Sequence, residues 1–340
     1  MPMDDAAYGE RNTRGVWKPL APIVYPPVFV WPARPVAFLK WLLGYPGFIL
    51  PWNLLYVLLS IVLWLYLTPS LETMRSLGVG WIGYLLLRNT GIAFGFYGAF
   101  HLRLYVLKAQ SGNFKFNPKW LAINNRAFLL GKQTADNMIR TLTSAVPIWT
   151  AYEALTLWAF ANGFIPIVSF EEHPIYFVCV IFLIPLWREL HFYLVHRMLH
   201  WPWLYRLAHK VHHKNINPGP WSGLAMHPIE HALYFSGILI HWIIPSHPIH
   251  ALFNEMHAAL SPAPAHTGFD KIVVGKEALI DTESYAHYLH HKYFECNYAD
   301  GVVPLDKWFG TFHDGSLEAE KRMRDRLINF RADRQRHAMD

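Results

Sequence analysis

Cysteine and charge are scarce in this 340-residue sequence, and each shortage excludes a class of protein. Cys179 and Cys296 are too few for a disulfide framework or for the thiolates of an iron–sulfur cluster. Charged residues make up 16% of the chain, against roughly 25% in ordinary soluble domains. The net charge is +6, but the basic residues lie beside apolar stretches, so no nucleic-acid partner is expected. The N-terminus has no apolar core of a signal peptide, so no cleaved signal is expected.

Hydrophobic residues, in contrast, make up 53% of the sequence and gather in long runs. Crossing a bilayer takes about 20 residues, and four runs approach or exceed that length, at 47–68, 80–106, 141–165 and 174–190. Arg88 interrupts the second run, where a charge is expected to face a partner or the protein interior. A further apolar region, 228–260, is broken by Pro245 and Pro248 and predicts a re-entrant or tilted hairpin.

The distribution of Lys and Arg predicts how these segments are oriented. Segments 1–46 and 108–139 carry five basic residues each, whereas 69–79 carries only Arg75 and 164–173 carries none. Because basic residues concentrate in cytoplasmic loops, the N-terminal arm, the 108–139 loop and the chain after residue 190 are expected in the cytoplasm. The predicted fold is therefore an all-α integral membrane protein. It has about four transmembrane helices, the re-entrant or tilted hairpin and a cytoplasmic histidine-rich helical cap.

The predicted organisation has four parts. An N-terminal cytoplasmic arm, 1–46, precedes a transmembrane region, 47–190, which contains the cytoplasmic loop 108–139. A histidine-rich region, 191–315, follows, and a charged tail, 316–340, ends the chain.

Histidine is concentrated where the fourth apolar run ends, with sixteen of the twenty histidines between residues 191 and 291. Three spaced sets stand out, one HxxxH and two HxxHH: His196 and His200; His209, His212 and His213; and His287, His290 and His291. Residues three or four apart lie on the same side of a helix, so each set can point its imidazole lone pairs at a common cation. Eight imidazoles suit two metal ions with open positions better than one closed structural site.

The same segments resemble the fatty acid hydroxylase/sterol desaturase superfamily, whose members are integral-membrane di-iron oxygenases acting on lipids. The resemblance covers roughly residues 175–315 and rests on HR at 196–197, LYRLAHKVHH at 204–213 and HYLHHKYFECNY…LDKWFGTFHDG at 287–315. It implies that region 191–315 is catalytic, that the eight spaced histidines are metal ligands, and that His266, in HTGFD, is a ninth. His257 is a weaker candidate, and His191 lies off the face of the first set. Glu189 replaces an aspartate common in the family and keeps a carboxylate that can orient an imidazole.

The resemblance also implies the chemistry and its partners. Two iron ions, or zinc in their place, would be bound, with O2 as cosubstrate, and an unactivated C–H bond of a lipid would be hydroxylated or desaturated. Electrons would come from a separate cytochrome b5, ferredoxin or reductase, since the sequence has no CxxCH or HPGG haem element. The site would face the cytoplasm, at a bacterial inner membrane or the endoplasmic reticulum. Near the histidine sets, Trp221, Tyr193 and Asn297 either shape the substrate pocket or pack the helices.

Three other functions fit parts of the pattern. A zinc-dependent membrane hydrolase acting on lipids would also use imidazole ligands, but the first set reads HRMLH and lacks the glutamate of HExxH. A haem-binding electron carrier would need the histidines on a spanning helix, which Pro202 and the nearby basic residues disfavour. A metal transporter would need His or acidic residues inside several spans, whereas Arg88 and Glu153 are isolated along the sequence.

Overall fold

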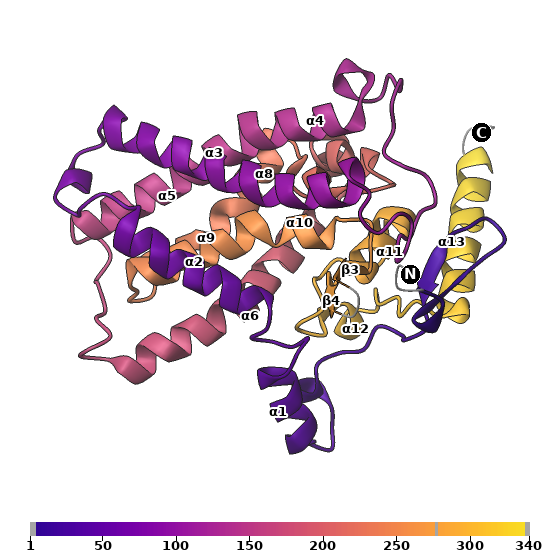
Figure 1. The fold of residues 1–340 in the computed structure, drawn as a ribbon, viewed down its shortest axis with the longest axis horizontal. Helices are drawn as coiled ribbons and strands as arrows, with labels where there is room; N and C mark the ends of the chain where they lie inside the picture. The colour runs from indigo at the N-terminus through magenta and orange to yellow at the C-terminus, as the bar shows by residue number, and fades with distance from the viewer. Residues whose placement is uncertain (1–4, 276–277, 337–340) are drawn as a thin grey trace.

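The computed structural model describes residues 5–275 and 278–336, so the first four residues of the arm and residues 337–340 of the tail lie outside it. Most of this part of the chain is helical (Figure 1). A helix bundle makes up one half of the molecule, and shorter helices and two β-hairpins form a cap beside it. Both described ends of the chain lie on the cap side.

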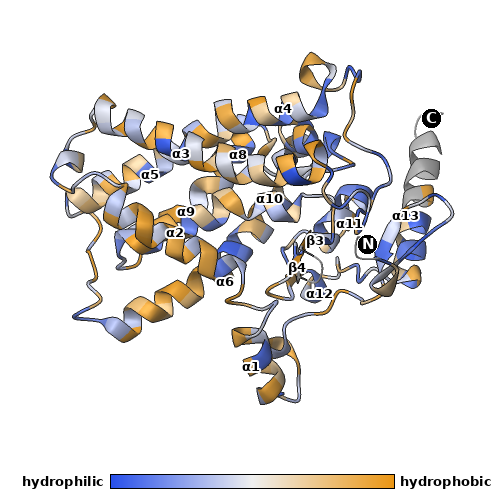
Figure 2. Cartoon of the chain, in the orientation of Figure 1, coloured by the Kyte–Doolittle hydropathy of each residue, from blue (hydrophilic) through white to orange (hydrophobic). Residues whose placement is uncertain are grey.

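Helix α9 (Pro248–Leu260) forms the centre of the bundle, with eleven of its thirteen residues buried. It packs against helices α2, α5 and α6, and less extensively against α3 and α8. The surrounding helices are α2 (Trp52–Tyr66), α3 (Val79–His101), α5 (Val146–Ala161), α6 (Pro174–Leu199) and α8 (Pro228–Phe235). Figure 2 shows apolar residues spread over much of these bundle helices rather than confined to a single stripe.

The predicted apolar runs correspond to helices with shifted ends. Helix α3 and the π-helical turn Leu102–Val106 together match the second run, while α2 is shorter than the first. The third run begins earlier than predicted, as α4 (Gln133–Arg140) and a π-helical turn (Thr141–Ala145) that lead into α5. Helix α6 begins at Pro174 as predicted but continues to Leu199, so no break separates the fourth run from the first histidine set.

Helix lengths do not confirm the predicted number of transmembrane helices. Within the described ranges, α6 alone is long and apolar enough to cross a membrane by itself, and α2 is apolar but has 15 residues.

The N-terminal end of α3 carries Gly78, Gly80 and Gly83 with the spacing of a dinucleotide-binding loop. These glycines follow a 3₁₀ turn (Thr73–Arg75) rather than a strand, so they do not form such a loop.

Arg88 has the buried partner that its position in an apolar helix requires. Its guanidinium binds the Glu153 carboxylate of α5, and Asn89 Nδ2 donates to Glu153 Oε2 at 2.8 Å. Arg88 and Glu153 are therefore an ion pair that joins α3 to α5, and the interpretation of the two residues as isolated is wrong.

The region 228–260 forms a helical hairpin, as predicted. Helix α8 continues through a 3₁₀ segment (Ser236–Trp242), and the chain turns and returns as α9. Each helix begins with His-Pro, in which the histidine Nδ1 accepts a backbone N–H of the first turn, from Ile229 and Ile249. At the far end Val168 N donates to Ser246 O at 3.0 Å, which ties the turn to the loop before α6.

The cap corrects the prediction of a fold made only of helices. Two short antiparallel hairpins are present: β1 (Gly9–Arg11) with β2 (Trp17–Pro19), in which Glu10 faces Lys18, and β3 (Lys271–Val274) with β4 (Ala278–Asp281), in which Ile272 faces Ile280. Positive φ values at Gly15 and Gly275 place glycine in the two connecting turns. The remaining helices are α1 (Pro35–Leu43), α7 (Pro202–Leu207), α10 (Pro262–Ala265), α11 (Tyr285–Tyr293), α12 (Leu305–Trp308) and α13 (Leu317–Arg336).

The N-terminal arm packs on the cap before it reaches the bundle. Trp17 N donates to Phe116 O at 2.9 Å, and Ile23 N donates to Asp314 O at 3.1 Å. Helix α1 lies apart from the bundle (Figure 1) and exposes apolar side chains, including Val36 and Leu43.

Candidate metal centre

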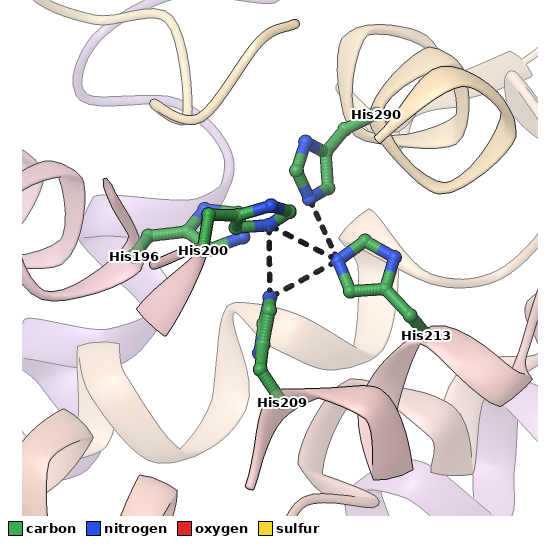
Figure 3. A group of neighbouring side chains, drawn as sticks. All are labelled: His196, His200, His209, His213 and His290. Atoms are coloured by element: carbon green, nitrogen blue, oxygen red, sulfur yellow. Dashed lines mark hydrogen bonds between the residues drawn. The ribbon is translucent and has the colours of Figure 1, made fainter. Parts of the chain in front are cut away.

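All nine predicted metal ligands come together in two groups. The five-histidine group contains His196, His200, His209, His213 and His290, and the four-histidine group contains His212, His266, His287 and His291. Within each group one nitrogen per ring lies within 4.8 Å of all the others. Figure 3 shows the five-histidine group, with rings from α6, from the 3₁₀ turn His209–Lys214 and from α11 converging on one point.

Each HxxHH set divides its histidines between the two groups. His209 and His213 belong to the five-histidine group, while His212 between them faces the four-histidine group. The second set does the reverse: His287 and His291 face the four-histidine group and His290 the other. The prediction that all three histidines of a set share one side is therefore wrong. Adjacent residues on a helix point about 100° apart, so neighbours such as His212 and His213 cannot face one centre.

The distances between Nε2 atoms match those between ligands of one ion. In the five-histidine group, His213 Nε2 lies 3.0 Å from His209 Nε2, 3.2 Å from His200 Nε2 and 3.1 Å from His290 Nε2 (Figure 3). In the four-histidine group, His287 Nε2 lies 2.9 Å from His266 Nε2 and 3.1 Å from His291 Nε2. Two nitrogens bound at about 2.1 Å and at a right angle to each other lie about 3.0 Å apart.

The other ring nitrogen, Nδ1, fixes which nitrogen carries the lone pair. His290 Nδ1 donates to Cys296 O at 2.7 Å, His196 Nδ1 to Tyr298 O at 2.7 Å, and His266 Nδ1 to Pro262 O at 2.9 Å. A neutral ring that donates from Nδ1 keeps its lone pair on Nε2. Lone pairs that converge at about 3 Å repel one another unless a cation lies between them. The residues therefore fit a metal ion in each group.

Glu230 gives a fourth ring the same support, and the sequence did not identify it. Its Oε1 accepts from His209 Nδ1 at 2.7 Å, and both side chains are buried. Glu189, the carboxylate expected in this role, instead accepts from Gly301 N at 2.8 Å and has no hydrogen bond to an imidazole among the described residues. Glu230 lies at the start of α8, so its approach to His209 depends on the path of the hairpin.

Asp306 holds the loop that orients two of the histidines. Its carboxylate accepts from Tyr298 N at 3.0 Å, Ala299 N at 2.8 Å and Thr311 Oγ1 at 2.6 Å. The loop presents Cys296 O and Tyr298 O, the acceptors for His290 and His196. Asp306 therefore positions these two rings through the backbone.

Burial keeps the imidazoles of His212, His266 and His291 neutral. Burial first, and neighbouring imidazoles second, hold the pKa of His212 and His291 well below its ordinary value. Burial lowers the pKa of His266 to about 3. At neutral pH these rings therefore carry free lone pairs, the form that binds a metal ion.

The remaining candidates lie outside both groups. His191 binds Ser236 Oγ at 3.0 Å, and His257 packs its ring 5.4 Å from that of Tyr56. Trp221, Tyr193 and Asn297 have packing roles: Trp221 lies against Tyr97, Tyr193 stacks on Phe309, and Asn297 bonds to the backbone of Ala286 and His313.

A cavity of about 760 Å³ lies between the bundle and the cap. His196 and His209 of the five-histidine group line it, and so do His212, His266 and His287 of the other group. Much of the remaining wall is apolar. Trp41 comes from α1, Phe48 from the segment between α1 and α2, Trp52 from α2 and Phe192 from α6, and residues 21–27 of the N-terminal arm also line it. The volume is within the range of small-molecule sites, roughly 300–1,000 Å³.

Comparison with known proteins points to one family. Residues 181–311 match the family model described as fatty acid hydroxylase. The chain is 30% identical over 129 residues to the Delta(7)-sterol 5(6)-desaturase ERG3B of Gibberella zeae, covering 36% of this chain and 38% of the relative. It is 31% identical over 128 residues to the Delta(7)-sterol 5(6)-desaturase ERG3 of Saccharomyces cerevisiae, covering 37% and 34%. The enzyme of the same name from Candida albicans is 25% identical over 242 residues, covering 65% and 59%.

The chain thus spans less than two thirds of the length of each of these relatives. No solved structure matches it. All nine clustered histidines lie inside the segment that matches the family. This segment is therefore similar to the fatty acid hydroxylase/sterol desaturase superfamily.

Proposed function

We propose that this protein is a membrane-bound di-iron oxygenase that hydroxylates or desaturates a lipid, either a sterol or a fatty-acyl chain. The observation that carries the proposal is that two converging groups of imidazoles line one largely apolar cavity. The relatives named as sterol desaturases favour a lipid substrate. We assign one iron to the five-histidine group and one to the four-histidine group.

Iron bound there would supply the activation of O2 that side chains alone cannot provide. The chain's own residues have three tasks. Glu230 and the carbonyls of Cys296, Tyr298 and Pro262 hold four imidazoles with Nε2 directed inward. The apolar wall receives a hydrocarbon portion of the lipid and excludes water from it. The side of the cavity lined by histidines places a C–H bond of that lipid beside the metal groups.

A membrane location follows from the same proposal. Helix α6 would carry the first histidine set at the end of a span, and the apolar side chains of α1 would lie at the membrane surface. We place the site on the cytoplasmic side, in the endoplasmic reticulum as for a eukaryotic sterol enzyme, or in a bacterial inner membrane. A separate cytochrome b5, ferredoxin or reductase would deliver electrons.

Metal content tests the proposal directly. Detergent-purified protein should hold about two irons per chain, one for each group, counted separately from zinc. His290→Ala and His287→Ala should each lower the iron content, because each removes a ligand from a different group. His173→Ala, at an exposed histidine before α6, should leave it unchanged.

The metal that is found distinguishes the oxygenase from the membrane hydrolase. Iron together with lipid-dependent O2 consumption, in the presence of a reductase, would support the oxygenase. Zinc alone, in protein expressed with ample iron, would favour the membrane hydrolase. Absence of any stoichiometric metal would overturn the assignment of both groups.

A further inference from the structure

A buried guanidinium lines the same cavity as the histidines. Arg188, on α6, is 2% exposed and lines the cavity wall. Its Nη2 donates to the hydroxyl of Tyr234, but Nε and Nη1 have no hydrogen-bond partner. A buried charged group with unpaired donors is costly, so a partner from outside the protein would stabilise it.

Tyr56, on α2, presents a second unpaired group to the same cavity. The side chain is fully buried, lines the cavity and has no partner for its hydroxyl. Other buried tyrosines of the bundle are paired: Tyr97 donates to Ala259 O at 2.7 Å and Tyr234 to Ala258 O at 2.8 Å. Tyr56 therefore differs from these two tyrosines in lining the cavity with an unpaired hydroxyl.

Carboxyl groups also line the cavity. Glu283 and Asp300 both line the cavity and are exposed, while Glu189 Oε1 accepts from Gly301 N. Donors and acceptors thus occur together. A negatively charged ligand group would be repelled by these carboxylates. A hydroxyl, in contrast, can accept a hydrogen bond from Arg188 or Tyr56 and donate one to a carboxylate.

Phe192 connects the Arg188 guanidinium to the histidines. The Arg188 guanidinium carbon lies 5.1 Å from the centre of the Phe192 ring, which lies 4.9 Å from the centre of the His196 ring. The guanidinium is therefore at most about 10 Å from His196. All three side chains line the cavity, so one lipid molecule can contact the polar end and the histidines together.

We propose that Arg188 and Tyr56, with Glu283 and Asp300, bind the hydroxyl group of a lipid alcohol whose hydrocarbon body extends to the histidine groups. The proposal rests on the function proposed above, since it names the class of lipid that would be oxidised. It predicts selection for a neutral oxygen at one end of the substrate and against an anion at that position.

Competition binding tests the site without requiring turnover. Protein in nanodiscs is loaded with a labelled Δ7-sterol that carries a free 3-hydroxyl. Competitors are the unlabelled sterol, its 3-methyl ether, its 3-sulfate and the corresponding hydrocarbon, with hexadecan-1-ol as a second lipid alcohol. The free sterol should compete about tenfold or more better than the hydrocarbon, the value expected for a hydrogen bond to a charged group. The ether should be intermediate and the sulfate poor. The comparison of sterol with hexadecan-1-ol identifies which lipid alcohol fits the wall.

Three variants assign the selectivity to residues. In Arg188→Met the advantage of the free sterol over the hydrocarbon should disappear. In Tyr56→Phe, which removes one hydroxyl, it should fall several-fold. Tyr97→Phe removes a paired buried hydroxyl that does not line the cavity and should leave the advantage unchanged.

Repeating the binding with His290→Ala separates this proposal from the proposed function. If selectivity depends on Arg188 but no lipid is oxidised, the alcohol site stands and the oxygenase assignment fails. If lipid is oxidised but Arg188→Met and Tyr56→Phe bind every competitor as the wild type does, the alcohol site is wrong. Equal binding of sterol and hydrocarbon by the wild type would also overturn it.

Discussion

Single residues decide how the imidazoles are held, and Glu230 is the clearest case. Replacing Glu230 with alanine removes the acceptor for His209 Nδ1, so the ring can rotate and change tautomer. We expect metal affinity of the five-histidine group to fall about ten- to hundredfold, while the four-histidine group keeps its metal. Titration with a chelator, monitored by metal analysis, measures the two affinities.

Two further variants make this measurement specific. Glu230→Gln keeps an acceptor oxygen and should lose less affinity than Glu230→Ala. Glu172→Ala, at an exposed carboxylate, should behave as wild type. Equal loss from both groups in Glu230→Ala would show that the contact supports general folding rather than His209.

Asp306 acts on two rings through the backbone. Asp306→Ala leaves Tyr298 N and Ala299 N without their acceptor, at a cost of about 1–3 kcal/mol for each unsatisfied group. We expect a lower melting temperature and weaker metal binding by the five-histidine group, to which His196 and His290 belong. Calorimetry on the metal-free and loaded protein measures both effects. Asp325→Ala, on the exposed side of α13, is the matched control, and a normal metal affinity in Asp306→Ala would contradict the positioning role.

At the scale of elements, the Arg88–Glu153 pair tests how α3 and α5 are joined. Either Arg88→Met or Glu153→Leu leaves one buried charge unpaired, which costs about 3–5 kcal/mol. The double variant removes both charges and should recover most of the lost stability. Thermal unfolding of all four proteins in the same detergent completes a double-mutant cycle. Additive losses in the double variant would mean that the two side chains do not interact.

Helices that have local signals in the sequence were predicted well, whereas strands too short to carry such signals were missed. The apolar run of α3 and the proline that begins α6 are local signals, and both helices were predicted to within a few residues at these positions. The hairpin 228–260 was predictable because Pro245 and Pro248 interrupt an apolar stretch. The two β-hairpins were missed because strands of three or four residues carry too few positions to show an alternating pattern.

The sequence predicted which histidines form the candidate site, but not how they are divided between the two groups. Spacing and family resemblance identified every histidine of both groups. The division of the HxxHH sets was not predictable, since the direction of His212 or His290 depends on how one segment is rotated against the other. Glu230 and Asp306 had no signal either, because an ordinary carboxylate gains its role only when a distant segment folds against it.

At the scale of the whole molecule, the N-terminal arm closes the cavity. Residues 21–27 form part of its wall, although the metal groups lie on distant elements. Replacing 21–27 with a glycine–serine linker of equal length should therefore weaken lipid binding about tenfold or more, through loss of apolar contact. Competition binding with the labelled sterol, alongside metal analysis, checks this. Loss of metal together with lipid would mean that the arm stabilises the whole cap.

The division of histidines between the groups has a consequence for how the protein acquires metal during synthesis. The five-histidine group needs His290, and the four-histidine group needs His212 as well as His291. Each centre is therefore incomplete on a nascent chain that has emerged only as far as the hairpin. Both would be completed together, late in translation, so a chain that ends before residue 287 would lack one ligand of the five-histidine group and two of the four-histidine group.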